Sequence, residues 1–365
     1  MHGKKENMVV CILFALLLYG GFLLCLFMPG PRYLESERRA PAAAPVLTGD
    51  ALWSGRFMTG FEDYGMDAFP FRDFFRSIKA LTAGGVFHRL DNNGVYVADG
   101  YISAMEYPYD DKSLDRAAER FRYIYDKYLT DENRVFLSVI PDKNCFLAGE
   151  YDRLSMDYGE FERQMAEKAD FAEYIRISDL LEREDYYKTD THWRQERILD
   201  VADRLAQSMG TELSKDYETH GVEGDFYGVY YGQAALPVEP DRIWYLTGEA
   251  IDNCRVYDWQ NGREIPVYNM ENTMGRDPYE MFLSGSLSLI TIENRDARTD
   301  KRLVIFRDSF GSSIAPLLID GYSRITLVDI RYIHPDMLGK FVDFEGCDVL
   351  FLYSTLVLNH SDTIK

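Results

Sequence analysis

Runs of apolar residues along the chain predict strands that are buried on both faces. Residues 134–140, RVFLSVI, form a nearly continuous run of β-branched and aromatic side chains that stops at Pro141. The runs at 302–308, 324–330 and 348–354 have the same character. Such runs are typical of a parallel sheet, because helices cover both of its faces.

Segments with helical spacing lie between and around these runs. Ser113 is predicted to cap a helix, since apolar residues follow it at helical spacing at Leu114, Ala117, Phe121, Ile124 and Tyr128. Strand, crossover helix and strand at this rhythm predict an α/β fold with a mostly parallel central sheet. Further helices are predicted from about Arg72, at 158–170, after Trp193, at 311–320 and at 333–343.

Two segments depart from this rhythm. Residues 93–102 alternate apolar and polar positions around an Asn-Gly and an Asp-Gly pair, which predicts a hairpin. Residues 210–275 are rich in Tyr, Gly and turn pairs, which predicts an insertion of short strands. The strand pattern resumes at 287–294.

An uncharged apolar segment precedes the part of the chain that is predicted to fold. Lys4 and Lys5 come before 21 residues without a charged side chain, from Met8 to Met28. At about 1.5 Å per residue, a helix of this length spans the hydrocarbon core of a bilayer. The segment 8–28 predicts a membrane signal anchor, because a cleaved signal peptide has a shorter apolar core and a small-residue cleavage site close behind it. A cleaved signal is the alternative.

The charges that flank this segment bear on its orientation. The two lysines favour a cytoplasmic N-terminus and an extracytoplasmic remainder, whereas Arg32, Arg38 and Arg39 on the other flank oppose that bias. The predicted location is therefore the cell membrane, with a single pass. We expect three parts: a cytoplasmic stub and anchor at 1–29, a tether rich in Pro and Ala at 30–52 and one folded domain at 53–365.

Composition restricts the classes of partner. Hydrophobic residues make up 46% of the chain and aromatic residues 14%, enough for a large core. The net charge of −20 leaves no basic face to neutralise phosphates, which excludes nucleic acid, and it disfavours broad attraction to anionic lipid. Cys145, Cys254 and Cys347 lie outside the apolar segment and fit no zinc pattern. They are small core residues or include one disulfide.

The first candidate for chemistry follows a predicted strand. Residues 302–308 run into Ser309, and Gly311 comes two residues later. The serine is therefore expected at the carboxyl end of a parallel strand, before a helix whose N–H groups can stabilise an oxyanion. An alternative is a plain helix cap by Asp308 or Ser309. The segment lacks the Gly-x-Ser-x-Gly elbow of the α/β-hydrolases.

The segment YYKTDTHWRQE, residues 186–196, contains the partners that a serine nucleophile requires. The neutral imidazole of His192 can accept the serine proton, and Asp190 can hold the other ring nitrogen. A histidine satisfied only by its neighbouring carboxylate is one alternative, and a helix start capped by Thr191 is another. Neither a metal nor a cofactor is expected, because no further His or Asp cluster completes a metal site.

Together these motifs resemble a known family. YYKTDTHW contains an Asp-x-His-Trp sequence similar to the signature of the DHHW family, which is related to the alginate O-acetylation proteins AlgJ and AlgX in the wider SGNH hydrolase-like superfamily. Further blocks match in order along nearly all of 53–360: FEDYGMDAFPFRD (61–73), NNGVYVADGYI (92–102), FLSVIPDKN (136–144), DFYGVYYGQA (225–234), FRDSFGSS (306–313), RITLVDIRY (324–332) and DVLFLYS (348–354).

The resemblance implies roles for particular residues on an SGNH-hydrolase-like three-layer sandwich. Ser309 is the expected nucleophile, His192 the general base and Asp190 the orienting carboxylate, and the histidine precedes the serine in the chain. Aromatic residues beside the motif are also expected at the substrate, although rings of this kind are often core. The expected oxyanion or substrate-binding residues are Gly285, Ser286, Arg307, Lys143, Tyr187 and Trp193.

Two positions depart from the family pattern. Thr191 stands where the family name spells a histidine, and it is expected to face away from the serine. FLSGSLSL, residues 282–289, stands where relatives are expected to carry a Gly-Gly-Asn-like turn. An asparagine there would donate to the oxyanion, and losing one such donor costs on the order of 10²–10³ in rate. The second departure therefore favours a lower or altered activity.

The resemblance implies an extracytoplasmic O-acetyltransferase that acts on a cell-surface or secreted polysaccharide through an acyl-enzyme. Proteins of this kind work beside a membrane-bound O-acyltransferase, which brings the acetyl group across the bilayer. Two alternatives are a carbohydrate acetyl esterase with the same three residues and a non-catalytic glycan-binding or assembly protein. The departure at 284–286 is the feature that favours the last of these.

Overall fold

The computed structural model describes residues 2–28, 30–37 and 39–365. Pro29, where the predicted anchor ends, and Arg38, one of the flanking arginines, lie outside the described residues. The chain forms two compact units. Unit 1 contains residues 1–92 and 232–237, and unit 2 contains 93–231 and 238–365.

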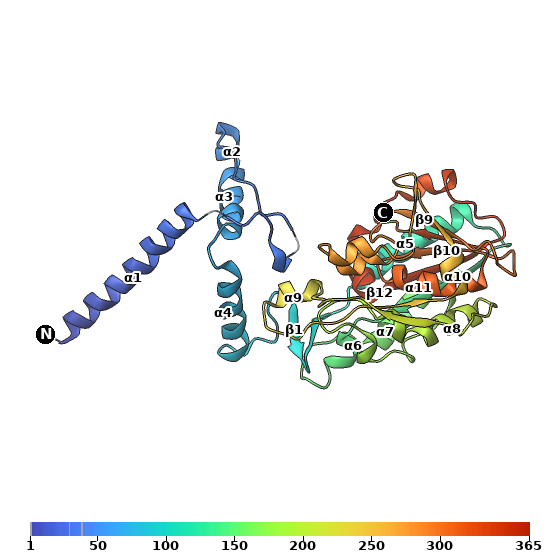
Figure 1. Cartoon of the computed structure of the whole chain (residues 1–365), viewed down its shortest axis with the longest axis horizontal. Helices are drawn as coiled ribbons and strands as arrows, with labels where there is room; N and C mark the ends of the chain where they lie inside the picture. The colour runs from blue at the N-terminus through green and yellow to red at the C-terminus, as the bar shows by residue number, and fades with distance from the viewer. Residues whose placement is uncertain (1, 29, 38) are drawn as a thin grey trace. The chain divides into compact units, whose positions relative to one another are not determined.

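Unit 1 begins with the long helix α1, His2–Phe27 (Figure 1). Its stretch Asn7–Cys25 is long and apolar enough to cross a membrane, a property that membrane anchors share with signal sequences. The predicted apolar helix is therefore confirmed as a helix. Whether it anchors the chain belongs to the proposed function.

Three shorter helices complete unit 1: α2, Gly49–Trp53; α3, Arg56–Asp67; and α4, Arg72–Gly85. α4 starts at the predicted residue, whereas α3 was not predicted. In the segment predicted as a tether, Leu34 and Arg39 form an isolated β-bridge, and the Arg39 guanidinium donates to both carboxylate oxygens of Asp67 at 2.6 and 2.7 Å. The chain is therefore folded back at this point rather than extended.

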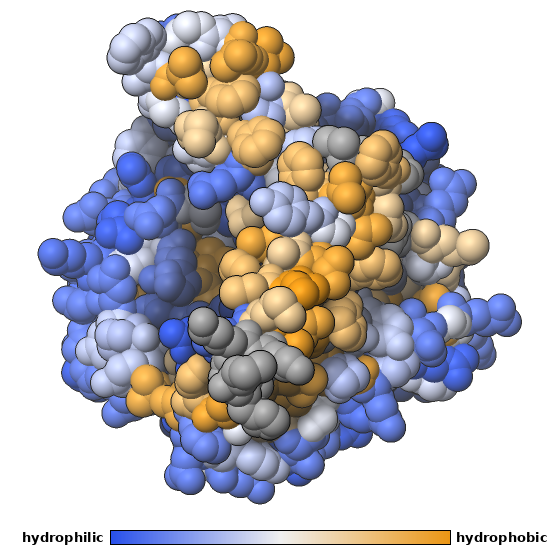
Figure 2. Space-filling view, turned by 90° about the vertical axis from the view of Figure 1, so that its left-hand side faces the viewer, coloured by the Kyte–Doolittle hydropathy of each residue, from blue (hydrophilic) through white to orange (hydrophobic). Residues whose placement is uncertain are grey.

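The helix α4 turns an apolar face outward. Phe71, at its N-cap, and Phe74 are each 62% exposed. The polar side is turned inward, where Arg72 pairs with Glu37 at 2.6 Å and Arg76 donates to the Gly232 carbonyl at 2.7 Å. Figure 2 shows apolar side chains gathered where α1 faces the viewer.

Unit 2 is built on an eight-stranded sheet with the order β4-β3-β12-β10-β11-β9-β7-β8. The pairings from β4 to β11 are parallel, and those from β11 to β8 are antiparallel. The sheet is therefore mixed, and the expectation of a mostly parallel sheet describes only its first five strands. The strands are β3, Arg134–Ile140; β4, Glu173–Tyr174; β7, Arg255–Asp258; β8, Arg263–Ile265; β9, Leu289–Glu293; β10, Arg302–Arg307; β11, Arg324–Val328; and β12, Asp348–Ser354.

Helices cover both faces of the parallel half of this sheet. Along β10, Leu303 and Ile305 pack in the core cluster with α8 and α11, whereas Val304 and Phe306 pack in the cluster with α5 and α7. This is the burial that the continuous apolar runs predict. The helices of this unit are α5, Asp111–Tyr128; α6, Asn144–Leu147; α7, Tyr158–Lys168; α8, Leu199–Ser208; α10, Glu249–Asn253; α11, Gly311–Leu318; and α12, Thr355–Asn359 (Figure 1).

The less regular segments have several outcomes. The predicted hairpin is confirmed as β1, Val95–Ala98, and β2, Tyr101–Ala104. Within 210–275, β5, Glu218–Gly221, pairs with β6, Trp244–Thr247. The strands β7 and β8 extend the main sheet instead of forming an insertion. The short helix α9, Val229–Ala234, also lies in this segment.

The prediction of a helix at 333–343 is wrong, since only a short 3₁₀ helix at Pro335–Lys340 forms there. Cys145, Cys254 and Cys347 are free thiols.

Ser113 is not the cap of α5. The side chain of Asp110 caps that helix by accepting from the Lys112 N–H. Ser113 lies one turn inside, fully buried, where its hydroxyl donates to the Leu358 carbonyl at 2.8 Å and accepts the Ser361 N–H at 2.7 Å. It therefore ties α5 to the C-terminal segment.

We expect Ser113→Ala to lower the free energy of unfolding by about 1–3 kcal/mol, because the buried Ser361 N–H loses its acceptor. Asp110→Ala removes only an exposed cap and is expected to cost about 1 kcal/mol. Urea unfolding of the full chain measures both values. A Ser113→Ala variant as stable as the wild type would contradict the assignment.

Candidate active site

Ser309 lies at the junction between β10, which ends at Arg307, and α11, which begins at Gly311. The neighbouring Asp308 is fully buried; its carboxylate accepts the Phe310 N–H at 3.0 Å and, from the adjacent strand end, the Ser354 N–H at 2.8 Å. Asp308 thus fixes the turn. The N-cap position of α11 is Phe310, without a side-chain cap bond, so Ser309 is not the helix cap that the alternative interpretation expected.

The structure brings Asp190, His192 and Ser309 together. His192 Nε2 lies 2.7 Å from Ser309 Oγ, and His192 Nδ1 lies 2.5 Å from Asp190 Oδ1. These contacts join segments that are 117 residues apart in the sequence. Asp190 is fully buried and His192 is 6% exposed. Ser309 is half-buried.

The Asp190 carboxylate remains ionised in a buried position. Burial raises the pKa of this group, but the charge and hydrogen bond of His192 and the N–H groups of Val229 and His192 hold the pKa well below its usual range. The Val229 N–H donates to Oδ2 at 2.9 Å and the His192 N–H to Oδ1 at 3.0 Å. Both carboxylate oxygens are therefore held in fixed directions.

A compact loop presents these two residues. Tyr186 and Trp193 form an isolated antiparallel bridge, and the Tyr187 N–H donates to the His192 carbonyl at 3.1 Å. Gly228 packs directly on the loop, because a Cβ atom there would lie 2.3 Å from the Asp190 Cα. No side chain larger than hydrogen fits at Gly228 without displacing Asp190.

Tyr279 lies against the imidazole and was not predicted from the sequence. Its ring stacks on His192 with centroids 3.7 Å apart and planes 5° apart. The Tyr279 hydroxyl donates to Ser313 Oγ at 2.9 Å, and Trp193 Nε1 donates to the same oxygen at 2.8 Å. Tyr279 therefore fixes the plane of the imidazole. The residue follows the irregular 210–275 segment, where no periodicity marks its partner.

Three predicted substrate-binding residues lie behind the loop. Tyr187 and Trp193 are fully buried in core clusters, so their side chains have no surface to offer a substrate. Lys143 is also buried, and its Nζ donates to the carbonyls of Tyr187 and Lys188 at 2.7 and 3.2 Å. Burial lowers the pKa of Lys143 to about 7, although Asp241, Asp190 and Asp142 act in the opposite direction. These residues support the loop from inside.

The loop at 282–286 carries two further predicted positions, Gly285 and Ser286. Leu283, Ser284 and Gly285 have φ values of 53°, 59° and 83°, and the Gly285 N–H donates to the Phe282 carbonyl at 3.1 Å. The Gly285 amide is thus already engaged within the loop, while Ser286 is exposed.

Arg307 is the basic side chain nearest in sequence to the serine. It is fully buried, and its guanidinium donates to the carbonyls of Asp308 at 3.2 Å and Leu287 at 3.4 Å. Burial lowers the pKa of Arg307 below its usual range. The side chain thus links the serine turn to the end of the 282–286 loop. Among the described residues, no group of three or more His, Cys, Asp or Glu side chains is arranged to hold a metal ion.

Comparison with known proteins identifies the fold. Neither a family model nor a curated protein matches the sequence. A DHHW family protein from Eubacterium siraeum superposes with a TM-score of 0.59 at 21% identity, covering 75% of this chain and 95% of that one. Bacillus cereus PatB1 superposes with a TM-score of 0.58 at 16% identity, covering 74% and 98%. The O-acetyltransferase domain of Pseudomonas putida AlgJ has a TM-score of 0.44 at 13% identity, covering 73% and 92%. The family resemblance noted in the sequence is thus confirmed as a likeness of fold.

The buried amine of Lys143 predicts a pH-dependent stability. Its folded-state pKa of about 7 is below the ordinary value of 10.5, so the unfolded chain binds more protons between these values. Stability contributed by this group therefore rises with pH across that window, by up to about 1.4 kcal/mol per unit. From pH 7 to pH 9, we expect the free energy of unfolding of the wild type to rise by about 2 kcal/mol relative to that of the Lys143→Met variant. Urea unfolding at both pH values measures this; a difference independent of pH would refute it.

Proposed function

We propose that this chain is an extracytoplasmic O-acetyltransferase that acts on a cell-surface or secreted polysaccharide, with Asp190, His192 and Ser309 as its catalytic triad. The observation that carries the proposal is the pair of contacts at 2.5 and 2.7 Å that joins the three side chains. A hydroxyl, an imidazole and a buried carboxylate in this order form an activated nucleophile. The domain is proposed to be SGNH-hydrolase-like.

The reaction would run through an acyl-enzyme. Ser309 Oγ attacks the carbonyl carbon of an acetyl ester while its proton passes to His192 Nε2. The ionised Asp190 stabilises the imidazolium, which then protonates the leaving alcohol. A polysaccharide hydroxyl next gives its proton to His192 and attacks the acetyl carbon. The bond from that carbon to Ser309 Oγ breaks, and Ser309 Oγ takes the proton from the imidazolium. Water in place of the sugar hydroxyl would make the same chain an esterase.

The oxyanion would be stabilised by the backbone at the start of α11 and by the neighbouring loop. We assign the backbone N–H groups of Ser309 and Ser286 as the donors, because the Gly285 N–H already donates to the Phe282 carbonyl. Arg307 would contribute by linking the two segments through its bonds to Asp308 and Leu287. The asparagine expected in relatives at 282–289 would be one further donor. Its absence would lower the rate on the order of 10²–10³-fold without abolishing activity.

The proposed location rests on the apolar helix of the N-terminal unit. The apolar helix α1 would anchor the chain in the cell membrane with unit 2 outside. The exposed rings of Phe74 and Phe75 on α4 suit a bilayer interface, where amphipathic helices bury Trp, Phe and Leu side chains. A membrane-bound O-acyltransferase would supply the acetyl group.

PatB1, which shares the fold, is known with a sulfonyl adduct. Sulfonyl reagents are therefore suitable probes of Ser309.

The proposal predicts a covalent adduct on one residue. Full-length chain in detergent is incubated with p-nitrophenyl acetate, and in a second arm with phenylmethanesulfonyl fluoride. Mass spectrometry is expected to locate an acetyl and a sulfonyl group on Ser309, and Ser309→Ala to lose at least about 10³-fold in turnover. Wild-type turnover in Ser309→Ala would overturn the proposal. Adding polysaccharide separates transfer from hydrolysis, because acetylated glycan forms only in transfer.

Gly228 tests the placement of the carboxylate. Gly228→Ala introduces a Cβ that must displace Asp190, and we expect kcat toward the acetyl ester to fall at least about 10²-fold, as small misplacements of catalytic groups do. Gly149→Ala is the matched control, since a Cβ at Gly149 meets nothing within 4 Å. Equal activity of the two variants would contradict the role of this contact.

A further inference from the structure

A groove of about 490 Å³ lies on the central sheet where its parallel and antiparallel parts meet, apart from the serine. On β10 it is lined by Arg302, Leu303 and Val304, in the first half of the strand, whereas Ser309 follows the opposite end. The size is that of a small-molecule or saccharide site. A short 3₁₀ helix at Pro335–Lys340 replaces the predicted crossover helix. Several side chains that line the groove, among them Trp259 and Phe341, are exposed.

Two rows of side chains cross this groove in register. The first row consists of Val304, Thr326, Thr291 and Tyr257, which are paired from strand to strand. The second row lies two residues away along each strand and therefore on the same face. Its members are Arg302, Arg324, Glu293 and Arg255. The floor of the groove is thus hydroxyl-bearing on one side and charged on the other.

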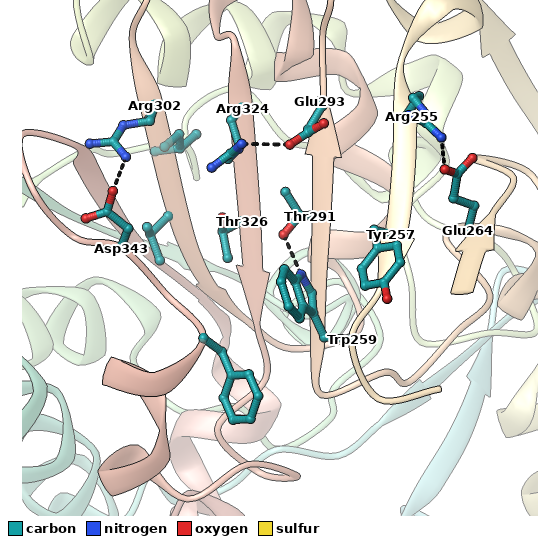
Figure 3. A pocket seen from close by; sticks show the side chains of 13 residues that line it. Arg255, Tyr257, Trp259, Glu264, Thr291, Glu293, Arg302, Arg324, Thr326 and Asp343 are labelled. Atoms are coloured by element: carbon teal, nitrogen blue, oxygen red, sulfur yellow. Dashed lines mark hydrogen bonds and ion pairs between the residues drawn. The ribbon is translucent and has the colours of Figure 1, made fainter. Parts of the chain in front are cut away.

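Aromatic rings project from this floor. Tyr257 and Trp259 contact each other edge to face with centroids 5.1 Å apart, and Phe341 lies 6.3 Å from Trp259. The three rings are 37%, 43% and 44% exposed, respectively. The Trp259 indole donates to Thr291 Oγ1 at 2.8 Å, which fixes the ring on the sheet (Figure 3). A half-exposed ring held in place offers a stacking surface that costs little entropy to use.

The charges in the groove are balanced in pairs. Arg324 pairs with Glu293 at 2.7 Å and Arg302 with Asp343 at 2.5 Å, and Figure 3 draws both pairs at the edge of the groove. A third pair joins Arg255 and Glu264. An anionic ligand would have to break one of these pairs and approach a chain whose net charge is −20. The lining therefore matches an uncharged ligand that is rich in hydroxyl groups.

We propose that this groove binds a segment of uncharged polysaccharide. The apolar C–H face of a sugar ring stacks on Trp259 and Tyr257, and its hydroxyls bond to the paired arginines and carboxylates and to the threonine hydroxyls. The inference rests on the proposed function, because it assigns the surface that holds the glycan for the same enzyme. The groove lining does not include Ser309, so a small ester can react at the serine without using the groove.

The test measures binding by the full-length chain and its variants in detergent. The panel contains uncharged oligomers of β-1,4-glucose, β-1,3-glucose, β-1,4-mannose and N-acetylglucosamine, and the anionic polymers alginate, polygalacturonate and hyaluronan. At least one uncharged oligomer is expected to bind. Trp259→Ala is expected to weaken its binding at least tenfold. Tyr257→Ser is expected to have the same effect, and this second variant leaves the hydrogen bond between Trp259 and Thr291 in place. Tyr123→Ala is the control, since Tyr123 is 40% exposed on α5 outside the groove lining.

Turnover of p-nitrophenyl acetate separates the two proposals. Trp259→Ala is expected to keep the small-ester kcat/KM within about twofold of the wild type, and Ser309→Ala to keep glycan binding. An acetyl adduct without glycan binding would overturn the groove alone. Glycan binding that depends on Trp259 without an adduct would overturn catalysis alone. Preference for the anionic polymers, or equal binding by the wild type and both groove variants, would also overturn the inference.

Discussion

The account depends on one buried negative charge. Asp190 is fully buried, and a carboxylate in that position is tolerated only when its oxygens are bonded. Its oxygens are held by the imidazole and N–H of His192 and by the N–H of Val229, which comes from a segment 39 residues away. The contact at Gly228 keeps that segment close. Because the carboxylate cannot turn, the imidazole is directed toward Ser309, and Tyr279 fixes its plane.

Different parts of the central sheet carry Ser309 and the groove. Its parallel half, covered by helices on both faces, directs the end of β10 into the turn that carries Ser309. Where the parallel and antiparallel parts meet, one face of the sheet carries the groove with Trp259 and the three ion pairs. The proposed nucleophile and the proposed glycan groove thus lie toward opposite ends of β10.

Much of this arrangement could be predicted from local sequence. The continuous apolar runs located β3, β10, β11 and β12, because strands buried on both faces leave that signal. The Asp-x-His spacing and the strand before Ser309 made three side chains candidates, and the family resemblance assigned their roles; the structure brings the three together. The direction of β9 and the loss of the helix at 333–343 depend on long-range pairing, which has no local signal. The same holds for Tyr279, whose stacking on His192 unites distant segments, and for Tyr187 and Trp193, whose burial follows from the loop bridge.

The most direct measurement of the central claim is a double-mutant cycle on acetyl-ester turnover with Asp190→Asn and Ser309→Ala. If the three side chains act as a unit, the double variant turns over at the rate of Ser309→Ala, since the carboxylate has nothing left to activate. If the two losses multiply instead, Asp190 and Ser309 act independently, and the triad assignment is wrong.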